Sequence, residues 1–306
     1  MSDIVFLPVP DVLPALYLVP AGMAHEDAER MAEAAIAQHV AEPLRGLALS
    51  ALGTKVLAVA VRPLSDFSVR EPGASADGDA FDVVAFASRT TACPGPVHEW
   101  VTRAAAASVA TDLGLPVLDC FASTWLDPDE ALATLPGAPD LAGVPGGFRL
   151  ADWVVVQRTG TCLTTCGMRR FGLPELMVDE VPPELHAAWT MMLMAVGARV
   201  LEHLRCALRG GEPGAFLELP AEFGVGRRDI ATGYGLPLAD DKRVLPVRLS
   251  VEPIIAGTLA SVLVVDSPAG LRTAEHRGAV RGLVTIPASS AARRGRRKQR
   301  AAASRD

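Results

Sequence analysis

The sequence lacks long apolar runs and a recognisable targeting segment. Its longest uncharged apolar stretches are residues 12–24, 187–198 and 253–265, which fall short of the roughly 20 residues that a helix needs to cross a bilayer. Asp3 stands where a secretory signal would carry a basic residue. We therefore expect no membrane segment and a cytoplasmic protein.

Cysteines are few and irregularly spaced. The five are Cys93, Cys120, Cys162, Cys166 and Cys206. An odd number without regular spacing argues against an extracellular disulfide framework and favours a reducing compartment. Cys162 and Cys166 form the only close pair, and in a strand their α-carbons would lie about 13 Å apart, too far for a disulfide or a shared zinc ion. We therefore expect no metal.

Motifs that bind phosphate or carry out catalysis are also lacking. The chain has no P-loop, no dinucleotide fingerprint, no GxSxG, SxxK or HExxH sequence and no EF-hand loop. The nearest approach to a phosphate loop is residues 224–229, which lack the third glycine and have no convincing strand before them. The six histidines are scattered, and Asp127, Asp129 and Glu130 fit the start of a short helix. We therefore expect no cofactor and name no catalytic residue.

What the sequence does contain is enough apolar material for a large core, since 50% of its 306 residues are hydrophobic. Period-two and helical patterns predict strands and helices in both halves. One stripe of the longest helix should be buried, and the opposite face, which carries Arg199, Glu202 and Arg205, should be exposed to water. The strands are expected at residues 13–19, 44–52, 55–62, 81–88, 115–122, 152–157, 161–166, 175–179, 244–251 and 258–265, and the main helices at 25–41, 96–113 and 182–209.

This order of elements predicts an α+β fold. Strand–helix units fill the first half, and hairpins surround one long helix in the second, which indicates a mixed, largely antiparallel sheet with helices packed on it. A stretch of glycines and prolines at residues 136–147 marks a linker or surface loop. We expect an N-terminal portion at 1–135, a C-terminal portion at 148–287 and a tail at 288–306. The alternative is that the first two portions form one continuous domain.

The tail differs from the rest of the chain in charge. It holds seven of the 29 basic residues and one of the 35 acidic ones, so the formal net charge of −6 combines a tail of +6 with a body of −12. Without apolar periodicity the tail should be disordered. The tail residues expected to bind a polyanion weakly are Arg293, Arg294, Arg296, Arg297, Lys298 and Arg300.

The most distinctive stretch is residues 165–176, TCGMRRFGLPEL. Two glycines bracket Arg169, Arg170 and Phe171 immediately after a predicted strand. The glycines would permit positive φ in a tight connection, with Phe171 in the core and both arginines in water. A rigid structural corner is the simplest interpretation. The functional alternative is an anion- or partner-binding loop that uses Arg169, Arg170 and Glu175.

This stretch resembles a motif of uncharacterised bacterial domains in which a hairpin ends in Gly-Met or Gly-Leu. Two residues, Phe-Gly and then Pro-Glu-Leu or Pro-Asp-Leu follow before a helix. The helix that begins His98-Glu99-Trp100 and the segment Pro116-Val117-Leu118-Asp119 are also similar to theirs. The resemblance covers roughly residues 81–209. Such domains are similar to the suppressor-of-fused-like group, several of whose bacterial members look like immunity or interaction proteins, and the resemblance implies no catalytic residues.

Three functions follow as expectations. The first is a non-enzymatic protein that binds another protein. The second is an enzyme with a noncontiguous site, for which the places to look are residues 167–175 and Asp119-Cys120 at the end of a strand. The third is weak nucleic-acid binding through the basic tail.

Overall fold

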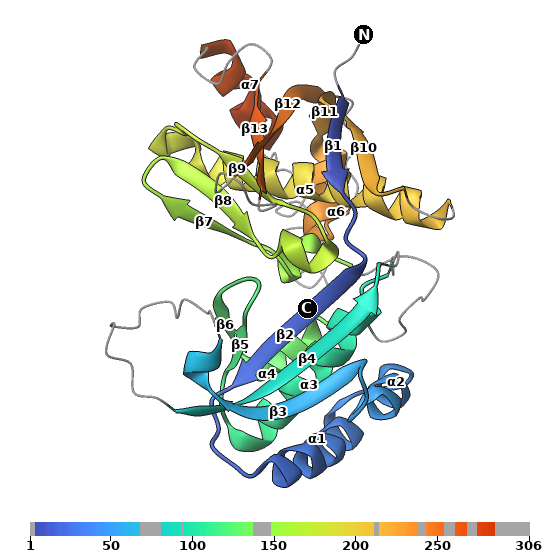
Figure 1. Ribbon diagram of the computed structural model, residues 1–306. Helices are drawn as coiled ribbons and strands as arrows, with labels where there is room; N and C mark the ends of the chain where they lie inside the picture. Colours follow the sequence, from blue (N-terminus) through green and yellow to red (C-terminus); the bar gives the residue numbers. More distant parts are fainter. Residues whose placement is uncertain are drawn as a thin grey trace, which may run out of the picture.

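The structure is a computed structural model that describes residues 4–67, 81–92, 95–136, 148–210, 214–237, 243–253, 261–267 and 274–284. It is an α+β fold with the long helix that the sequence predicts (Figure 1). The strands are β1 (Ile4–Pro8), β2 (Val12–Val19), β3 (Leu57–Pro63), β4 (Asp82–Thr91), β5 (Val117–Asp119), β6 (Thr124–Leu126), β7 (Val155–Thr159), β8 (Cys162–Cys166), β9 (Glu175–Val178), β10 (Phe216–Pro220), β11 (Glu222–Gly226), β12 (Val244–Pro253) and β13 (Ser261–Asp266). The α-helices are α1 (His25–His39), α2 (Leu44–Ala51), α3 (Val97–Leu113), α4 (Pro128–Ala133), α5 (His186–Arg209), α6 (Arg227–Tyr234) and α7 (Ala274–Val284), with short 3₁₀ turns η1 (Leu64–Asp66), η2 (Leu150–Asp152), η3 (Met168–Phe171) and η4 (Pro183–Leu185).

The five-stranded sheet forms the lower part of the molecule in Figure 1, in the order β3-β4-β2-β5-β6. Helices α1 and α3 pack against one face of it, and α2 packs against these two helices. Every residue of α3 from His98 to Ala110 is buried, because its run of alanines lets neighbouring elements approach closely from all sides. The face of the sheet away from α3 carries a smaller apolar cluster around Leu18 and Leu118.

The six-stranded sheet forms the upper part, in the order β11-β12-β13-β9-β8-β7. Its pairs are antiparallel except β13 with β9. Leu163, Leu176 and Leu263 belong to the same buried core as α5, whereas Thr164, Met177 and Val264 alternate with them along the strands and are only partly buried.

The N-terminal strand β1 connects the two parts. It pairs with β10, more than 200 residues away in sequence, and the chain then runs directly into β2 of the five-stranded sheet (Figure 1). One continuous apolar core includes side chains of both parts. In the described residues, no helix is long and apolar enough to cross a membrane.

Several local predictions were wrong. The strand expected at residues 44–52 is instead helix α2, Leu44–Ala51, because Leu44 and Ala48 lie one turn apart and both are buried. The strand expected at 115–122 ends at Asp119, where the chain turns back into β6. Arg205 was expected in water, yet only 6% of it is exposed, and its guanidinium lies over the Phe148 ring, 4.4 Å from the centroid.

Candidate functional site

The connection between β8 and β9 has the backbone that its glycines predicted. Gly167 and Gly172 adopt φ values of +122° and +77°, which are favourable only for glycine. At Gly167 a β-carbon would lie 2.5 Å from the carbonyl oxygen of Trp153. The predicted tight connection is therefore confirmed, and Phe171 is buried in the core as expected.

Glu175 holds this connection in place. Its carboxylate accepts hydrogen bonds from the Thr165 hydroxyl at 2.8 Å and from the backbone N–H groups of Gly167, Met168 and Arg169 at 3.0, 3.1 and 3.3 Å. Burial raises the pKa of Glu175, although these hydrogen bonds oppose the rise. Four donors occupy most of the acceptor capacity of a carboxylate, so Glu175 orders the loop around it.

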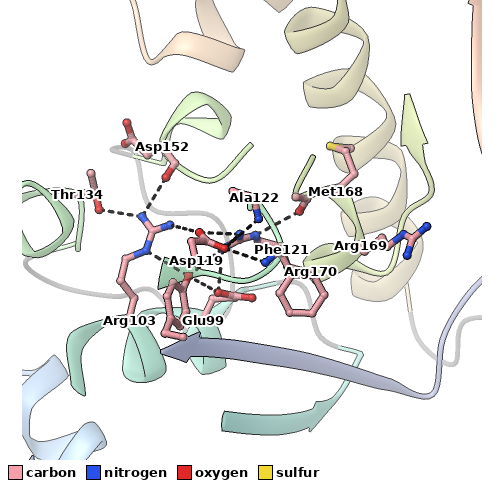
Figure 2. A network of polar contacts seen from close by, with 12 residues as sticks. Glu99, Arg103, Asp119, Phe121, Ala122, Thr134, Asp152, Met168, Arg169 and Arg170 are labelled. Atoms are coloured by element: carbon pink, nitrogen blue, oxygen red, sulfur yellow. Dashed lines mark hydrogen bonds and ion pairs between the residues drawn. The ribbon is translucent and has the colours of Figure 1, made fainter. Parts of the chain in front are cut away.

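The two arginines of the loop differ completely in environment. Arg169 is exposed, whereas Arg170 has no exposed side-chain surface, so the prediction that both face water was wrong for Arg170. Figure 2 shows Arg170 pointing into a polar network and Arg169 pointing away from it. The side chains of consecutive residues in a 3₁₀ turn point about 120° apart. In η3, the side chain of Arg170 therefore points into the protein when that of Arg169 points out.

Arg170 enters a network built by the five-stranded part. Its Nη2 lies 2.6 and 2.8 Å from the carboxylate oxygens of Asp119 at the end of β5. Its Nη1 donates to the Tyr17 hydroxyl of β2 at 2.8 Å and to Glu99 of α3 at 3.1 Å. The carboxylates of Asp119 and Glu99 more than offset the desolvation of the guanidinium, so the pKa of Arg170 stays raised.

Arg103 completes the network one helical turn after Glu99. It donates to Asp119 at 3.2 Å, to the Thr134 hydroxyl at 3.1 Å and to the backbone carbonyl of Asp152 at 2.9 Å. Its guanidinium also stacks on Trp153, 3.5 Å from the ring centroid. Two buried arginines therefore face two buried carboxyl groups.

Asp119 also shapes the β5–β6 hairpin. Its Oδ1 accepts hydrogen bonds from the backbone N–H groups of Phe121 and Ala122 at 3.1 and 3.0 Å. Ser123 in the same turn has a φ of +50°, which is uncommon outside glycine. The buried network therefore positions the tip of this hairpin over the six-stranded sheet.

An open cavity of about 610 Å³ lies between the hairpin tip and the partly buried face of the six-stranded sheet. We call it the junction cavity. Its lining residues are Cys120, Phe121, Ser123, Thr164, Thr165, Cys166, Arg169, Glu175, Met177, Glu252, Pro253 and Val262. The two places named from the sequence, residues 167–175 and Asp119-Cys120, thus meet at one cavity, which Arg169, Glu175 and Cys120 line and Arg170 does not.

The junction cavity is mainly apolar with few charges. Burial raises the pKa of the Cys120 thiol to about 12 and that of the Cys166 thiol to about 11, so both are protonated at neutral pH and are poor nucleophiles. In the described part of the chain, no ion pair or hydrogen bond engages the Arg169 guanidinium. The cavity can therefore hold an apolar group with a hydrogen-bond acceptor against Arg169.

Two other sequence candidates form neither a phosphate site nor a metal site. A strand, β11, does lead into Gly224–Asp229, contrary to expectation, but the Asp229 carboxylate accepts from the Gly226 N–H at 2.8 Å and occupies the start of α6 itself. Cys162 and Cys166 lie at opposite ends of β8 as free thiols. In the described ranges, no three His, Cys, Asp or Glu side chains are grouped to hold a metal ion.

The sequence signals for the network were weak. Glu99 and Arg103 lie four residues apart in the predicted helix, but nothing local relates them to Tyr17 or Arg170. The tail residues Arg293, Arg294, Arg296, Arg297, Lys298 and Arg300 lie outside the described residues. No family model matches the chain, and neither the curated proteins nor the solved structures contain a significant match.

Proposed function

We propose that this protein is a non-enzymatic binding protein that takes a segment of another protein into the junction cavity. The observation that carries the proposal is the exposed Arg169 guanidinium beside an apolar wall. Phe121, Met177 and Val262 supply the apolar contacts, and Arg169 supplies a charged donor. A partner segment with an apolar side chain next to a carboxylate satisfies both.

The rigidity of the cavity supports this proposal. Glu175 fixes the backbone that carries Arg169, and Asp119 fixes the hairpin that carries Phe121. A preformed site avoids much of the entropy cost of ordering its own residues when a partner binds. The resemblance to interaction-type bacterial domains agrees with this role, and the free thiols Cys120, Cys162, Cys166 and Cys206 agree with a reducing cytoplasm as the proposed compartment.

Site-specific cross-linking in the native host tests the proposal. A photoreactive amino acid at position 177 inside the cavity should capture a protein that the same group at position 158, on β7 of the same sheet, does not capture. The captured protein is then purified, and its affinity is measured by calorimetry with the unmodified chain, Arg169→Glu and the matched control Arg158→Glu.

We expect Arg169→Glu to weaken binding at least tenfold, because it places a carboxylate against that of the partner, while Arg158→Glu leaves the affinity unchanged. Equal affinities for all three proteins would contradict the proposal. Equal capture at both positions would do the same.

An enzyme remains the second candidate, because the two segments singled out from the sequence converge on one cavity. The protonated thiols disfavour a cysteine nucleophile. Turnover by the purified protein that Arg169→Ala or Cys120→Ala abolishes without loss of stability would establish this candidate. Polyanion binding by the tail stays a separate prediction, which truncation after Pro287 and a salt titration would test.

A further inference from the structure

A second, much smaller void lies away from the junction cavity, between the start of α3 and the end of α5. Its volume is about 10 Å³, close to the space that one water-sized particle needs. Its walls are mainly apolar. The lining residues are Leu13, Pro96, His98, Phe171, Leu201, Leu204, Arg205 and Leu208.

Two polar side chains on these walls have buried nitrogen atoms without a hydrogen bond. Both ring nitrogens of His98 and the Nη2 of Arg205 are buried without a hydrogen bond in the described part of the chain. Their residues are only 4% and 6% exposed. The large majority of buried polar side-chain atoms in proteins have a partner, so two such side chains lining one void indicate a site for a small hydrogen-bonding ligand.

The charges around the void favour an anion as that particle. Burial lowers the pKa of Arg205 only to about 10, so its guanidinium is cationic at neutral pH. The nearby carboxylate of Glu202 is exposed and bonds Arg209 at 2.8 Å. The Phe148 ring offsets part of the cationic charge. The positive charge of Arg170 also lowers the pKa of His98.

His98 suits the same ligand. Burial lowers its pKa to about 4, so the ring is neutral at pH 7 and carries one N–H donor. An anion between His98 and Arg205 would accept from both side chains and neutralise a cation whose burial is otherwise costly. Leu208 on the wall is only partly buried, which leaves a short route from solvent.

We infer that this void is a binding site for a single monatomic anion of the size of chloride, held between His98 and Arg205. A monatomic anion is only slightly larger than a water molecule, whereas an oxyanion such as sulfate is several times larger than the void. Because α3 belongs to the five-stranded part and α5 to the six-stranded part, the bound ion links the two parts. Chloride therefore stabilises the folded protein by binding it in preference to the unfolded chain.

Thermal unfolding in sodium chloride and in sodium gluconate at equal ionic strength tests this inference. Chloride should raise Tm by about 2–4 °C and then saturate. Arg205→Met should lose the difference between the two salts, whereas Arg199→Met, on the exposed side of the same helix, should keep it. Equal Tm values in both salts, or an unchanged chloride effect in Arg205→Met, would overturn the inference.

Crystals of the unmodified protein soaked in bromide give a test that needs no variant. An anomalous peak within hydrogen-bond distance of His98 and Arg205 is expected. A water molecule at that position without anomalous signal would show that the void takes a neutral ligand, which contradicts the anion site even if Arg205→Met fails to fold.

Discussion

The guanidinium of Arg170 and the carboxylate of Asp119 form a fully buried ion pair between the two parts of the molecule, with Nη2 2.6 and 2.8 Å from the two oxygens. The partners are 51 residues apart in the sequence. Arg170 comes from the connection after β8, and Asp119 from the end of β5. The pair thus joins the six-stranded part to the five-stranded part.

Asp119→Asn should lower the free energy of unfolding by about 3–5 kcal/mol, because it leaves the buried Arg103 without a carboxylate partner and the buried Arg170 with Glu99 alone. Urea titration followed by circular dichroism measures this loss. Asp11→Asn is the matched control at an exposed aspartate and should change the value by less than about 0.5 kcal/mol. Similar losses in both variants would contradict the assignment of Asp119 to the network.

Gly172→Ala should be more destabilising than Gly53→Ala, although both glycines have positive φ, +77° and +71°. A β-carbon at Gly53 meets nothing within 4 Å, so only backbone strain of about 1–2 kcal/mol is expected. At Gly172 the β-carbon would also collide with the ring of Pro10 and with Leu13. Urea unfolding of the two variants should therefore differ by at least about 1 kcal/mol, and equal losses would argue against this packing.

His98 should make the protein sensitive to mild acid. Its pKa is lowered from 6.5 to about 4 in the folded state, so between these values the unfolded chain binds a proton that the folded chain does not. Stability therefore falls as the pH drops below about 6.5, by about 1.4 kcal/mol per pH unit, until about pH 4. Urea unfolding at pH 6.5 and at pH 5, in buffer without chloride, measures the free energy of unfolding that is lost between these pH values. This loss should be about 2 kcal/mol smaller in His98→Gln than in the unmodified protein. The same loss in both proteins would refute the role of His98.

The thiols should differ in reactivity. Cys206 is exposed, whereas burial raises the pKa values of Cys120 and Cys166 to about 12 and 11. Since the thiolate is the reactive form, iodoacetamide at pH 8 should alkylate Cys206 well before the other two. Peptide mass spectrometry over a time course measures the order, and faster modification of Cys120 would show that the cavity activates its thiol.

The sequence predicted those parts of the fold that depend on local patterns. The apolar stripe of α5 through Trp189, Leu193 and Val196 is buried as expected, because it depends only on helical spacing. The sequence did not predict strand β1, because the strand pairs with β10, which is more than 200 residues away. The apolar residues of 44–51 fit both the two-residue period of a strand and the period of a helix. The segment is helical because its buried side packs against neighbouring helices.

For the site, the sequence predicted the tight connection at the two glycines. It could not show which of the two arginines is buried and which is exposed. Arg169 and Arg170 are chemically identical, and both follow Gly167 within three residues. What distinguishes them is the pair of carboxyl groups on Glu99 and Asp119, 71 and 51 residues away from Arg170. Only the tertiary fold brings these groups together.

The division of roles between Arg170 and Arg169 is tested most directly by comparing the free energies of unfolding of Arg170→Met and Arg169→Met in urea titrations. We expect a loss of about 3–5 kcal/mol for Arg170→Met, because Asp119 would keep only Arg103 and Glu99 would lose its ion pair. For the exposed Arg169→Met we expect a change within about 0.5 kcal/mol. Equal effects, or a larger loss at Arg169, would contradict the division between an internal arginine and a binding arginine.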